Sequence, residues 1–558
     1  DVCSSDLLGI FALNCVAQRT PPQPIPADFG LGPHLLQMSL AGASLKTKTH
    51  FHRALTVGRW PHIIASDMKM FSHSALICFL FIVAGNHVPA AENKPLLHSL
   101  FSDHAVLQRD VRVPVRGWAE PGSRITVRFA DQKKEAVAGK DGQWTVTLDP
   151  MPASAEGRTL EVRSAASHRE SRINGVLAGD VWLCSGQSNM EMGIGLCNEP
   201  EEMAQADFPG IRLLTVPHRI SFEPEATLDC EWLPCSSGNL KQGTWGGFSA
   251  VAYFFGRELH RELGVPIGLI HASWGGTPAE AWTSGEALAP LGDYSTQLAQ
   301  VNQVAASTAP DRLNAFMDRW YQEKDPGTAQ AWFKPETDVS KWKTNSMPAA
   351  WSKSGLPGYE GIVWLQRTFD VPAAWAGKNL MLSLGAIADV DTTWVNGQLV
   401  GRCDYFDQAR SYTVPATAMR AGRNVITLRV MNAGGGGFMS PADLIKIHPV
   451  DEAGSAVSLA GNWRLQETVT RAATGAPLAG NPGVPSVLYN GMIAPLIPCA
   501  IRGAIWYQGE ANTAEPTRYR TLLPAMIRDW RARFGSGDFG FHIVSLANYQ
   551  PATDPASD

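Results

Sequence analysis

The feature that most constrains the fold is a strand, helix, strand succession near the middle of the chain. Residues 180–184 and residues 267–270 are short apolar runs typical of buried strands. Between them, Ser249 can cap a helix that Gly264 would end. The apolar face of this helix is expected to consist of Val251, Phe255, Leu259 and Leu263. Strands joined through a helix at this spacing predict a parallel sheet, and therefore an α/β fold.

The α/β pattern is interrupted and then resumes. Residues 330–450 have β texture, with Asn396 and Gly397 as a hairpin turn. Residues 504–507 and 541–546 predict further strands, and residues 517–534 predict an amphipathic helix between them. The apolar residues of that helix are Leu522, Leu523, Met526, Ile527, Trp530 and Phe534. The simplest account is one α/β domain with a β-domain inserted into it.

A smaller β-domain is predicted at about residues 95–175. Apolar and polar residues alternate over 124–129, and Trp144, Val146 and Leu148 repeat the same period of two. Gly142 precedes the second run and can supply a tight turn. An immunoglobulin-like sandwich is the expected architecture.

The region before this domain has the features of a targeting segment. Lys69, the apolar stretch 74–84 and the small residues that follow give residues 68–91 the layout of a secretory signal peptide. We therefore expect an exported protein, periplasmic or extracellular, with residues 1–67 as upstream non-native sequence. A short N-terminal membrane anchor is the alternative. No later segment reaches the ~20 apolar residues of a membrane helix, so no stable membrane span is expected.

Composition narrows the classes of partner. The formal net charge is -5 and no Lys/Arg-rich run occurs, which argues against nucleic acid. The nine cysteines show neither paired C-x-x-C spacing nor a Cys/His cluster, so a structural zinc site is not expected. No other metal and no cofactor are expected either. Cys230 and Cys235 are close enough for a local disulfide in an oxidising compartment, and buried thiols are the equal alternative.

Three polar clusters follow predicted strands, where α/β sheets bind ligands. Ser188 follows the strand 180–184 in a Gly-Gln-Ser turn, and residues 274–277 (Trp-Gly-Gly-Thr) follow the next strand. Residues 506–512 follow a third strand and offer two side-chain amides. A nucleophilic hydroxyl together with N–H donors is what an acyl-transfer site requires. Taken singly, each cluster could be ordinary turn or capping chemistry.

These motifs resemble those of the sialate O-acetylesterases and related acetylxylan esterases of the SGNH hydrolase superfamily. The matching segments are residues 179–192, 273–282, 488–493 and 505–512. The resemblance implies that Ser188 is the nucleophile and that its own backbone N–H lies in the oxyanion hole. It also implies one donor from Gly275 or Gly276 and another from Gln508 or Asn512, with Gly276 and Gln508 favoured.

The resemblance also implies a domain order: an SGNH-hydrolase-type parallel sheet with an N-terminal Ig-like β-domain and an inserted β jelly roll. The expected ranges are 1–67 for upstream sequence, 68–91 for the signal peptide, 92–174 for the Ig-like domain, 175–329 for the first part of the α/β domain, 330–450 for the jelly roll and 451–558 for the second, truncated part of the α/β domain.

One expected motif is absent. The family implies an Asp-x-x-His segment near its C-terminus, and none of the 14 histidines lies in that context. His448 has Ile445 where the aspartate is required, and His542 lies inside a predicted strand. His271 lies at a strand end, where a structural role is favoured over a place in the pocket. Because a serine without a base is a poor nucleophile, we expect these 558 residues alone to be nearly inactive.

The resulting hypothesis is a serine-dependent O-acetylesterase, a hydrolase acting on an acetylated carbohydrate. The choice between acetylated sialic acid and plant-type glycans is left open, as is the oligomeric state. Two rivals are a glycosidase, for which Glu510 is one candidate carboxylate, and a glycan-binding protein without catalysis.

Overall fold

The computed structural model describes residues 94–546, apart from residues 244, 405–407, 433–435, 439, 452–453, 475–479 and 498. The predicted upstream sequence, 1–67, and the predicted signal peptide, 68–91, lie outside the described residues, as do residues 547–558. Everything described below belongs to the unit His87–Asp558.

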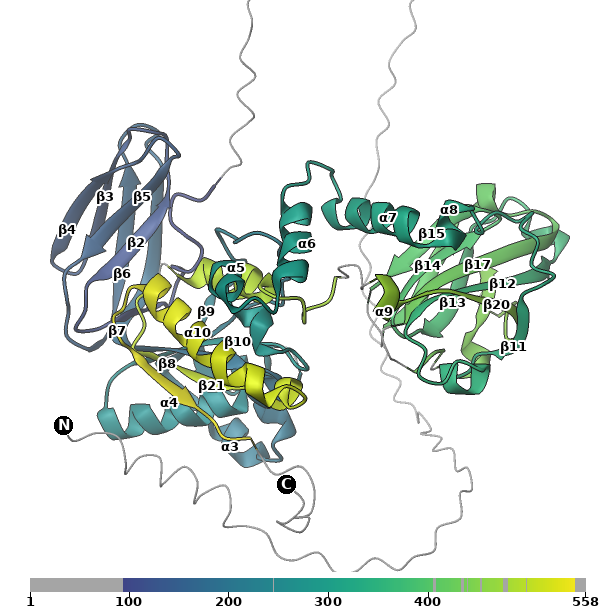
Figure 1. The fold of residues 1–558 in the computed structure, drawn as a ribbon. Helices are drawn as coiled ribbons and strands as arrows, with labels where there is room; N and C mark the ends of the chain where they lie inside the picture. Colours follow the sequence, from purple (N-terminus) through teal and green to yellow (C-terminus); the bar gives the residue numbers. More distant parts are fainter. Residues whose placement is uncertain are drawn as a thin grey trace, which may run out of the picture. The chain divides into compact units, whose positions relative to one another are not determined.

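The predicted parallel sheet is present (Figure 1), which confirms the α/β assignment. Its neighbouring strands, in spatial order, are β8 (Asp207–Thr215), β10 (Ile267–Ser273), β7 (Glu170–Gly186), β21 (Gly503–Tyr507) and β22 (Gly540–Ile543). All these pairs are parallel, and β9 (Trp232–Ser236) adds an antiparallel edge beside β8. The predicted strands 180–184, 267–270, 504–507 and 541–546 all fall on this sheet, although the last ends at Ile543.

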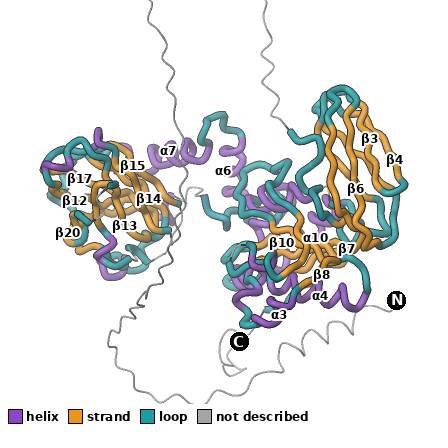
Figure 2. Tube along the Cα trace, turned by 180° about the vertical axis from the view of Figure 1, so that it is seen from behind, coloured by secondary structure: helices purple, strands orange, loops and turns teal. Residues whose placement is uncertain are grey.

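Helices cover both faces of the sheet. Side chains alternate between the two faces of a strand, and along β7 they enter two different cores. Trp182 and Cys184 pack with Tyr253 of α4 (Ala250–Leu263). Leu183 packs in the core that contains Met526 of α10 (Pro516–Phe534). The α/β part is therefore a three-layer structure with α4 and α10 on opposite faces (Figures 1 and 2).

Helix α4 has the predicted ends, and its predicted apolar face is confirmed in part. Ser249 Oγ accepts a hydrogen bond from the N–H of Ala252, and Gly264 ends the helix at φ +64°. Its buried residues are Ala250, Ala252, Tyr253 and Gly256. Of the predicted face, Val251, Phe255 and Leu259 are partly buried against the same core, whereas Leu263 is 51% exposed. The closest packing is made by a small residue, because a Cβ on Gly256 would lie only 2.6 Å from Leu269 Cδ1 of β10.

Helix α10 agrees with its prediction. It ends at Phe534 and is followed by Gly535 at φ +62°. Its buried residues are Leu522, Ala525, Met526, Trp530 and Phe534. The remaining helices are α2 (Ser188–Glu191), α3 (Pro200–Gln205), α5 (Gly285–Leu288), α6 (Ser295–Ala305), α7 (Arg312–Lys324), α8 (Pro326–Ala329) and α9 (Arg471–Thr474).

Strand β7 continues from the N-terminal β-region into the parallel sheet. Its first half pairs antiparallel with β6 (Ser154–Ser164), and its second half pairs parallel with β10 and β21. The other strands of the region are β2 (Val113–Trp118), β3 (Arg124–Phe129), β4 (Gln132–Val137) and β5 (Gln143–Leu148). The predicted boundary between residues 174 and 175 therefore lies inside a continuous strand, while the immunoglobulin-like class stays a prediction.

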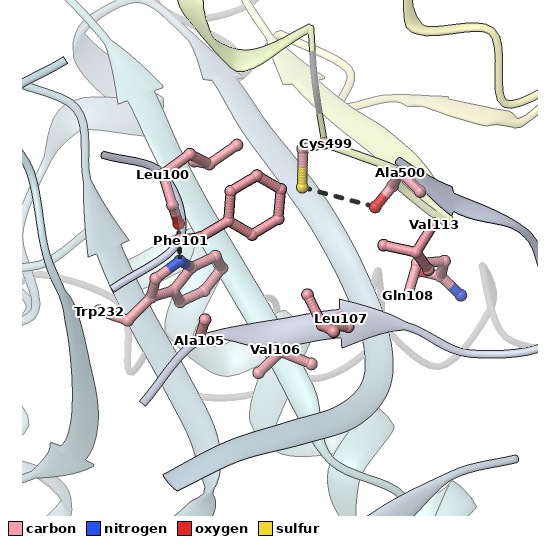
Figure 3. A pocket seen from close by; sticks show the side chains of 10 residues that line it. All are labelled: Leu100, Phe101, Ala105, Val106, Leu107, Gln108, Val113, Trp232, Cys499 and Ala500. Atoms are coloured by element: carbon pink, nitrogen blue, oxygen red, sulfur yellow. Dashed lines mark hydrogen bonds between the residues drawn. The ribbon is translucent and has the colours of Figure 1, made fainter. Parts of the chain in front are cut away.

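The residues that precede β2 pack closely against the parallel sheet (Figure 3). Strand β1 (Val106–Gln108) pairs with β7, and Trp232 Nε1 donates to the carbonyl of Leu100 at 2.9 Å. The void left between Leu100, Trp232 and Cys499 measures about 10 Å³. A space of that size holds about one water molecule, so it is a packing gap and not a ligand site.

The inserted β-region contains two sheets. One has the order β11 (Lys343–Met347), β20 (Gly461–Thr470), β12 (Gly361–Val371), β17 (Gly422–Asn432), β14 (Val390–Val395) and β15 (Gln398–Cys403). The other has the order β16 (Ala409–Val414), β13 (Leu380–Ala386), β18 (Lys446–Pro449) and β19 (Val457–Ser458). The predicted hairpin turn between β14 and β15 is confirmed, with Asn396 at φ +50° and Gly397 at φ +85°.

The C-terminal boundary predicted at residue 450 was too early. Strand β20 pairs antiparallel with both β11 and β12. Trp463 and Leu465 of β20 are buried in the same core as Leu365 and Val430. The chain therefore leaves this region only after residue 470, and the jelly-roll class stays a prediction.

Three further observations concern the described part of the chain only. The six cysteines there, which include Cys230 and Cys235, are free thiols, so the local disulfide considered above is not formed. No group of three or more His, Cys, Asp or Glu residues is arranged to hold a metal ion. None of the helices between residues 94 and 546 is long and apolar enough to cross a membrane.

The close approach of α4 to β10 generates a stability prediction. We expect Gly256→Leu to lower the free energy of unfolding by about 1–3 kcal/mol, because the new side chain overpacks a filled core. Leu263→Ala on the exposed side of α4 should change it by less than about 0.5 kcal/mol. Urea unfolding of both variants measures the difference. Equal losses would contradict the importance of this contact.

Candidate functional site

The carboxyl ends of three strands lie at the same level of the sheet. Gly186, the last residue of β7, pairs with Ser273 at the end of β10 and with Tyr507 at the end of β21. The three polar clusters predicted from the sequence therefore start side by side, which confirms that they share one edge. The strand order also reverses at this edge, because β8 and β10 lie on one side of β7 and the later strand β21 lies on the other, and ligands usually bind at such a point.

A glycine is required where β7 ends. Gly186 has φ +147°, and a Cβ there would lie 2.1 Å from the carbonyl oxygen of Tyr507. The next N–H, that of Gln187, donates to the same oxygen at 3.0 Å. The chain therefore turns tightly over β21 and begins helix α2 at Ser188. Ser188 is partly exposed, whereas Gln187 before it is buried.

Two neighbours of Ser188 bind the turn to the cluster after β21. The Gln187 side-chain oxygen accepts from the N–H groups of Gly509 at 3.3 Å and Ala511 at 3.1 Å. The Asn189 amide donates to Glu510 Oε1 at 2.5 Å. The residues on each side of the serine are thus used to fix its position, and Ser188 itself remains accessible.

A third neighbour, Glu191, binds the cluster after β10. Its Oε2 accepts from the N–H of Gly275 at 2.6 Å, and its side chain is 8% exposed. A Cβ on Gly275 would lie 3.4 Å from Ser188 Cβ, so this glycine packs directly against the serine. Glu191 lies in the segment 179–192 that carries the resemblance, but no role was predicted for it. Its position one helical turn after Ser188 was the available signal.

His218 completes this side of the site and was also missed. Its Nε2 lies 3.2 Å from Glu191 Oε1 and 3.0 Å from the carbonyl oxygen of Ser273. Its ring stacks on Trp274, with centroids 4.0 Å apart and planes 4° apart. His218 follows the carboxyl end of β8, and this position could have identified it. The sequence analysis did not predict that strand.

The two glycines proposed as donors have different surroundings. The Gly275 N–H is bound to the Glu191 carboxylate. Gly276 is exposed at φ +72°, and no described atom lies within 4 Å of the place its Cβ would occupy. Of the two alternatives, this geometry favours Gly276, which was the preferred one.

The two amides predicted as donors lie together in a buried network. Gln508 Nε2 donates to the carbonyl of Thr277 at 3.2 Å and to Asn512 Oδ1 at 2.6 Å. Asn512 Oδ1 also accepts from the N–H of Ala279 at 2.9 Å, and its Nδ2 donates to Glu280 at 2.9 Å. Both hydrogens of the Gln508 amide are engaged. If Gln508 is to serve an oxyanion, one of them must leave its present partner.

The three histidines considered in the sequence analysis contact groups other than Ser188. His271 Nε2 lies 2.6 Å from Ser273 Oγ, and burial lowers the pKa of His271 to about 4, which makes it a weak base. His542 lies on β22 against the Trp182 ring, where burial lowers its pKa. His448 lies on β18, and its Nδ1 is 2.8 Å from the carbonyl oxygen of Pro449. These contacts favour a structural role for the three histidines over a role as the base.

Comparisons with known proteins find similar carbohydrate esterases. Residues 178–334 match the family model described as carbohydrate esterase, sialic acid-specific acetylesterase. The sialate O-acetylesterase of Homo sapiens is 36% identical over 207 residues, which are 35% of this chain and 40% of the relative. That of Rattus norvegicus is 34% identical over 218 residues, 37% of this chain and 40% of the relative.

Among solved structures, a carbohydrate acetylesterase from Xanthomonas citri matches with a TM-score of 0.44 and 24% identity. The match covers 82% of this chain and 61% of that one. The chain spans about 40% of the length of the curated relatives it matches. The resemblance inferred from the sequence motifs is confirmed by these matches.

The turn at Gly186 can be tested with a matched glycine. We expect Gly186→Ala to cost about 2–5 kcal/mol of unfolding free energy, because both φ and the Tyr507 backbone oppose a Cβ. Gly292 also has positive φ, +80°, but lies in open space, so Gly292→Ala should cost only about 1–2 kcal/mol. Denaturant unfolding of both variants provides the comparison. If Gly186→Ala loses no more unfolding free energy than Gly292→Ala, β21 can move enough to accommodate the Cβ.

Proposed function

We propose that this protein removes O-acetyl groups from acetylated sugars, with Ser188 as the nucleophile. The observation that carries the proposal is the register of Gly186 with Ser273 and Tyr507. It brings the partly exposed Ser188 and the two other polar clusters to one edge of the sheet, which supports the proposal. The segment that contains Ser188 and Gly276 also matches the acetylesterase family model.

The proposed mechanism is an ordinary acyl transfer. A base takes the Ser188 proton as Oγ attacks the acetyl carbonyl, and the developing oxyanion is bound by the N–H groups of Ser188 and Gly276. Gln508 or Asn512 supplies a third donor. The sugar alcohol leaves with a proton from the same base. Water then attacks the acetyl-enzyme and acetate is released.

The base is proposed to be the histidine of an Asp-x-x-His pair, as the family resemblance implies. That motif does not occur in these 558 residues. His271 is a poor substitute, because its pKa is lowered by burial and its Nε2 is bound to Ser273. Since Ser188 needs a base, acetate release is to be measured on the full-length protein.

Two features support acetylated glycans outside the cytoplasm as the substrate. Relatives that match this chain over 207 residues are named sialate O-acetylesterases. The predicted signal peptide at residues 68–91 supports export. In this proposal the inserted β-region is a jelly roll that presents a sugar-binding surface, and the N-terminal β-region is an immunoglobulin-like support for the catalytic sheet.

The central test is acetate release from O-acetylated sialic acid and from acetylated xylan. We expect Ser188→Ala to lower kcat by at least about 10³-fold on the preferred substrate, because the attacking oxygen is lost. Ser458→Ala, on an exposed strand of the inserted region, should have the activity of the unchanged protein.

Each alternative predicts a distinct result. Undiminished acetate release from the Ser188→Ala variant would exclude the proposed nucleophile. Release of reducing sugar without acetate would indicate a glycosidase, although Glu510 is already bonded to Asn189. Glycan binding without either product would indicate a binding protein. The ratio of the two acetate rates identifies the preferred glycan.

A further inference from the structure

We infer that Glu191 is a positioning residue that holds the oxyanion-binding segment against the nucleophile. This inference rests on the proposed function. It assigns to Glu191 the task of fixing Gly275, so that the N–H of Gly276 faces the reacting carbonyl. Glu191 does this from the same short helix that carries Ser188.

The first observation is the direct bond between the two parts. Ser188 and Glu191 are the first and last residues of α2, so they lie one turn apart on one side of the helix. The Gly275 N–H donates to the Glu191 carboxylate at 2.6 Å. Hydrogen bonds to a charged acceptor are about twice as strong as neutral ones. The bond therefore couples the position of the glycine segment to that of the serine.

The second observation is that the carboxylate is itself held. It is buried, and its other oxygen lies 3.2 Å from His218 Nε2. His218 also contacts the Ser273 carbonyl and stacks on Trp274. We call Glu191 and His218 the carboxylate clamp. The clamp contacts Ser273, Trp274 and Gly275 in succession, immediately before the proposed donor.

The third observation explains why a clamp is needed. Gly275 and Gly276 carry no side chains that could be packed, and glycine loses more conformational freedom on ordering than other residues. A side chain at Gly275 would crowd the site, because its Cβ would lie 3.2 Å from Glu191 Oε2 and 3.4 Å from Ser188 Cβ. A buried hydrogen bond to a fixed carboxylate replaces the missing packing.

The clamp also separates the roles of the two glycines. The Gly275 N–H cannot bind Glu191 and an oxyanion with the same hydrogen. Gly275 therefore acts as the anchor, and Gly276, with open space beside it, provides the donor.

The test compares two substitutions at one position. Glu191→Gln keeps an oxygen that can accept from Gly275, whereas Glu191→Ala removes the acceptor. We expect Glu191→Ala to lower kcat by about 10²-fold, in the range for loss of one oxyanion donor, with KM changed less than about threefold. Glu191→Gln should keep kcat within about tenfold of the unchanged protein. Glu201→Ala, on the exposed side of α3, is the matched control.

A second measurement does not depend on activity. Amide hydrogen exchange of a peptide spanning residues 272–278 should be at least about tenfold faster in the Glu191→Ala variant and near its original rate in the Glu191→Gln variant. If Glu191→Ala does not fold, His218→Phe takes its place. That change keeps a ring against Trp274, removes the partner of Glu191, and is expected to lower kcat about tenfold with KM unchanged.

The outcomes separate this inference from the proposed function. A folded Glu191→Ala variant with unchanged kcat, or with equal kcat loss in the Gln variant and unchanged exchange at 272–278, overturns the positioning role. Unchanged kcat in the His218→Phe variant overturns it when the alanine variant cannot be used. Acetate release that is independent of Ser188 overturns the proposed function, and the exchange rates still report whether the clamp holds Gly275.

Discussion

The backbone pairing of β7 on both of its sides is the constraint from which the site follows. Gly186 has Ser273 on one side and Tyr507 on the other, so three chain segments that are distant in sequence leave the sheet together. The lack of a side chain at Gly186 lets the Tyr507 backbone approach to this distance. Without that approach, neither the turn into α2 nor the bond from Gln187 to Tyr507 could form.

The short sequence around Ser188 can then be understood residue by residue. Gln187 and Asn189 bind the segment after β21, and Glu191 binds the segment after β10. The polar residues beside the serine are therefore engaged in holding both neighbouring segments at fixed distances from it. Such fixed distances would favour the proposed acyl transfer, since donors that are already oriented need no rearrangement during a reaction.

The sequence alone predicted the elements whose signals are local. Capping by Ser249, the stop at Gly264, the period of α10 and the Asn396-Gly397 turn are all present. Prediction from the sequence failed where contacts between distant segments determine the structure. The face of α4 was predicted only in part, because Ala252 and Gly256, which look neutral in a hydropathy pattern, are among its fully buried residues. The clamp was missed because His218 and Glu191 are far apart in sequence, and their pairing depends on sheet order.

Strand β7 carries a further consequence, because its first half pairs with β6 and its second half with β10 and β21. Side chains alternate strictly along a strand, so the loss of one residue between the two halves would reverse the facing of everything after it. Trp182 would then point toward the layer of α10, and Leu183 toward that of α4. Such a deletion could not be absorbed by a loop, as it could between ordinary domains. Evolutionary changes in length should therefore be excluded from this strand and collect in the connections that follow it.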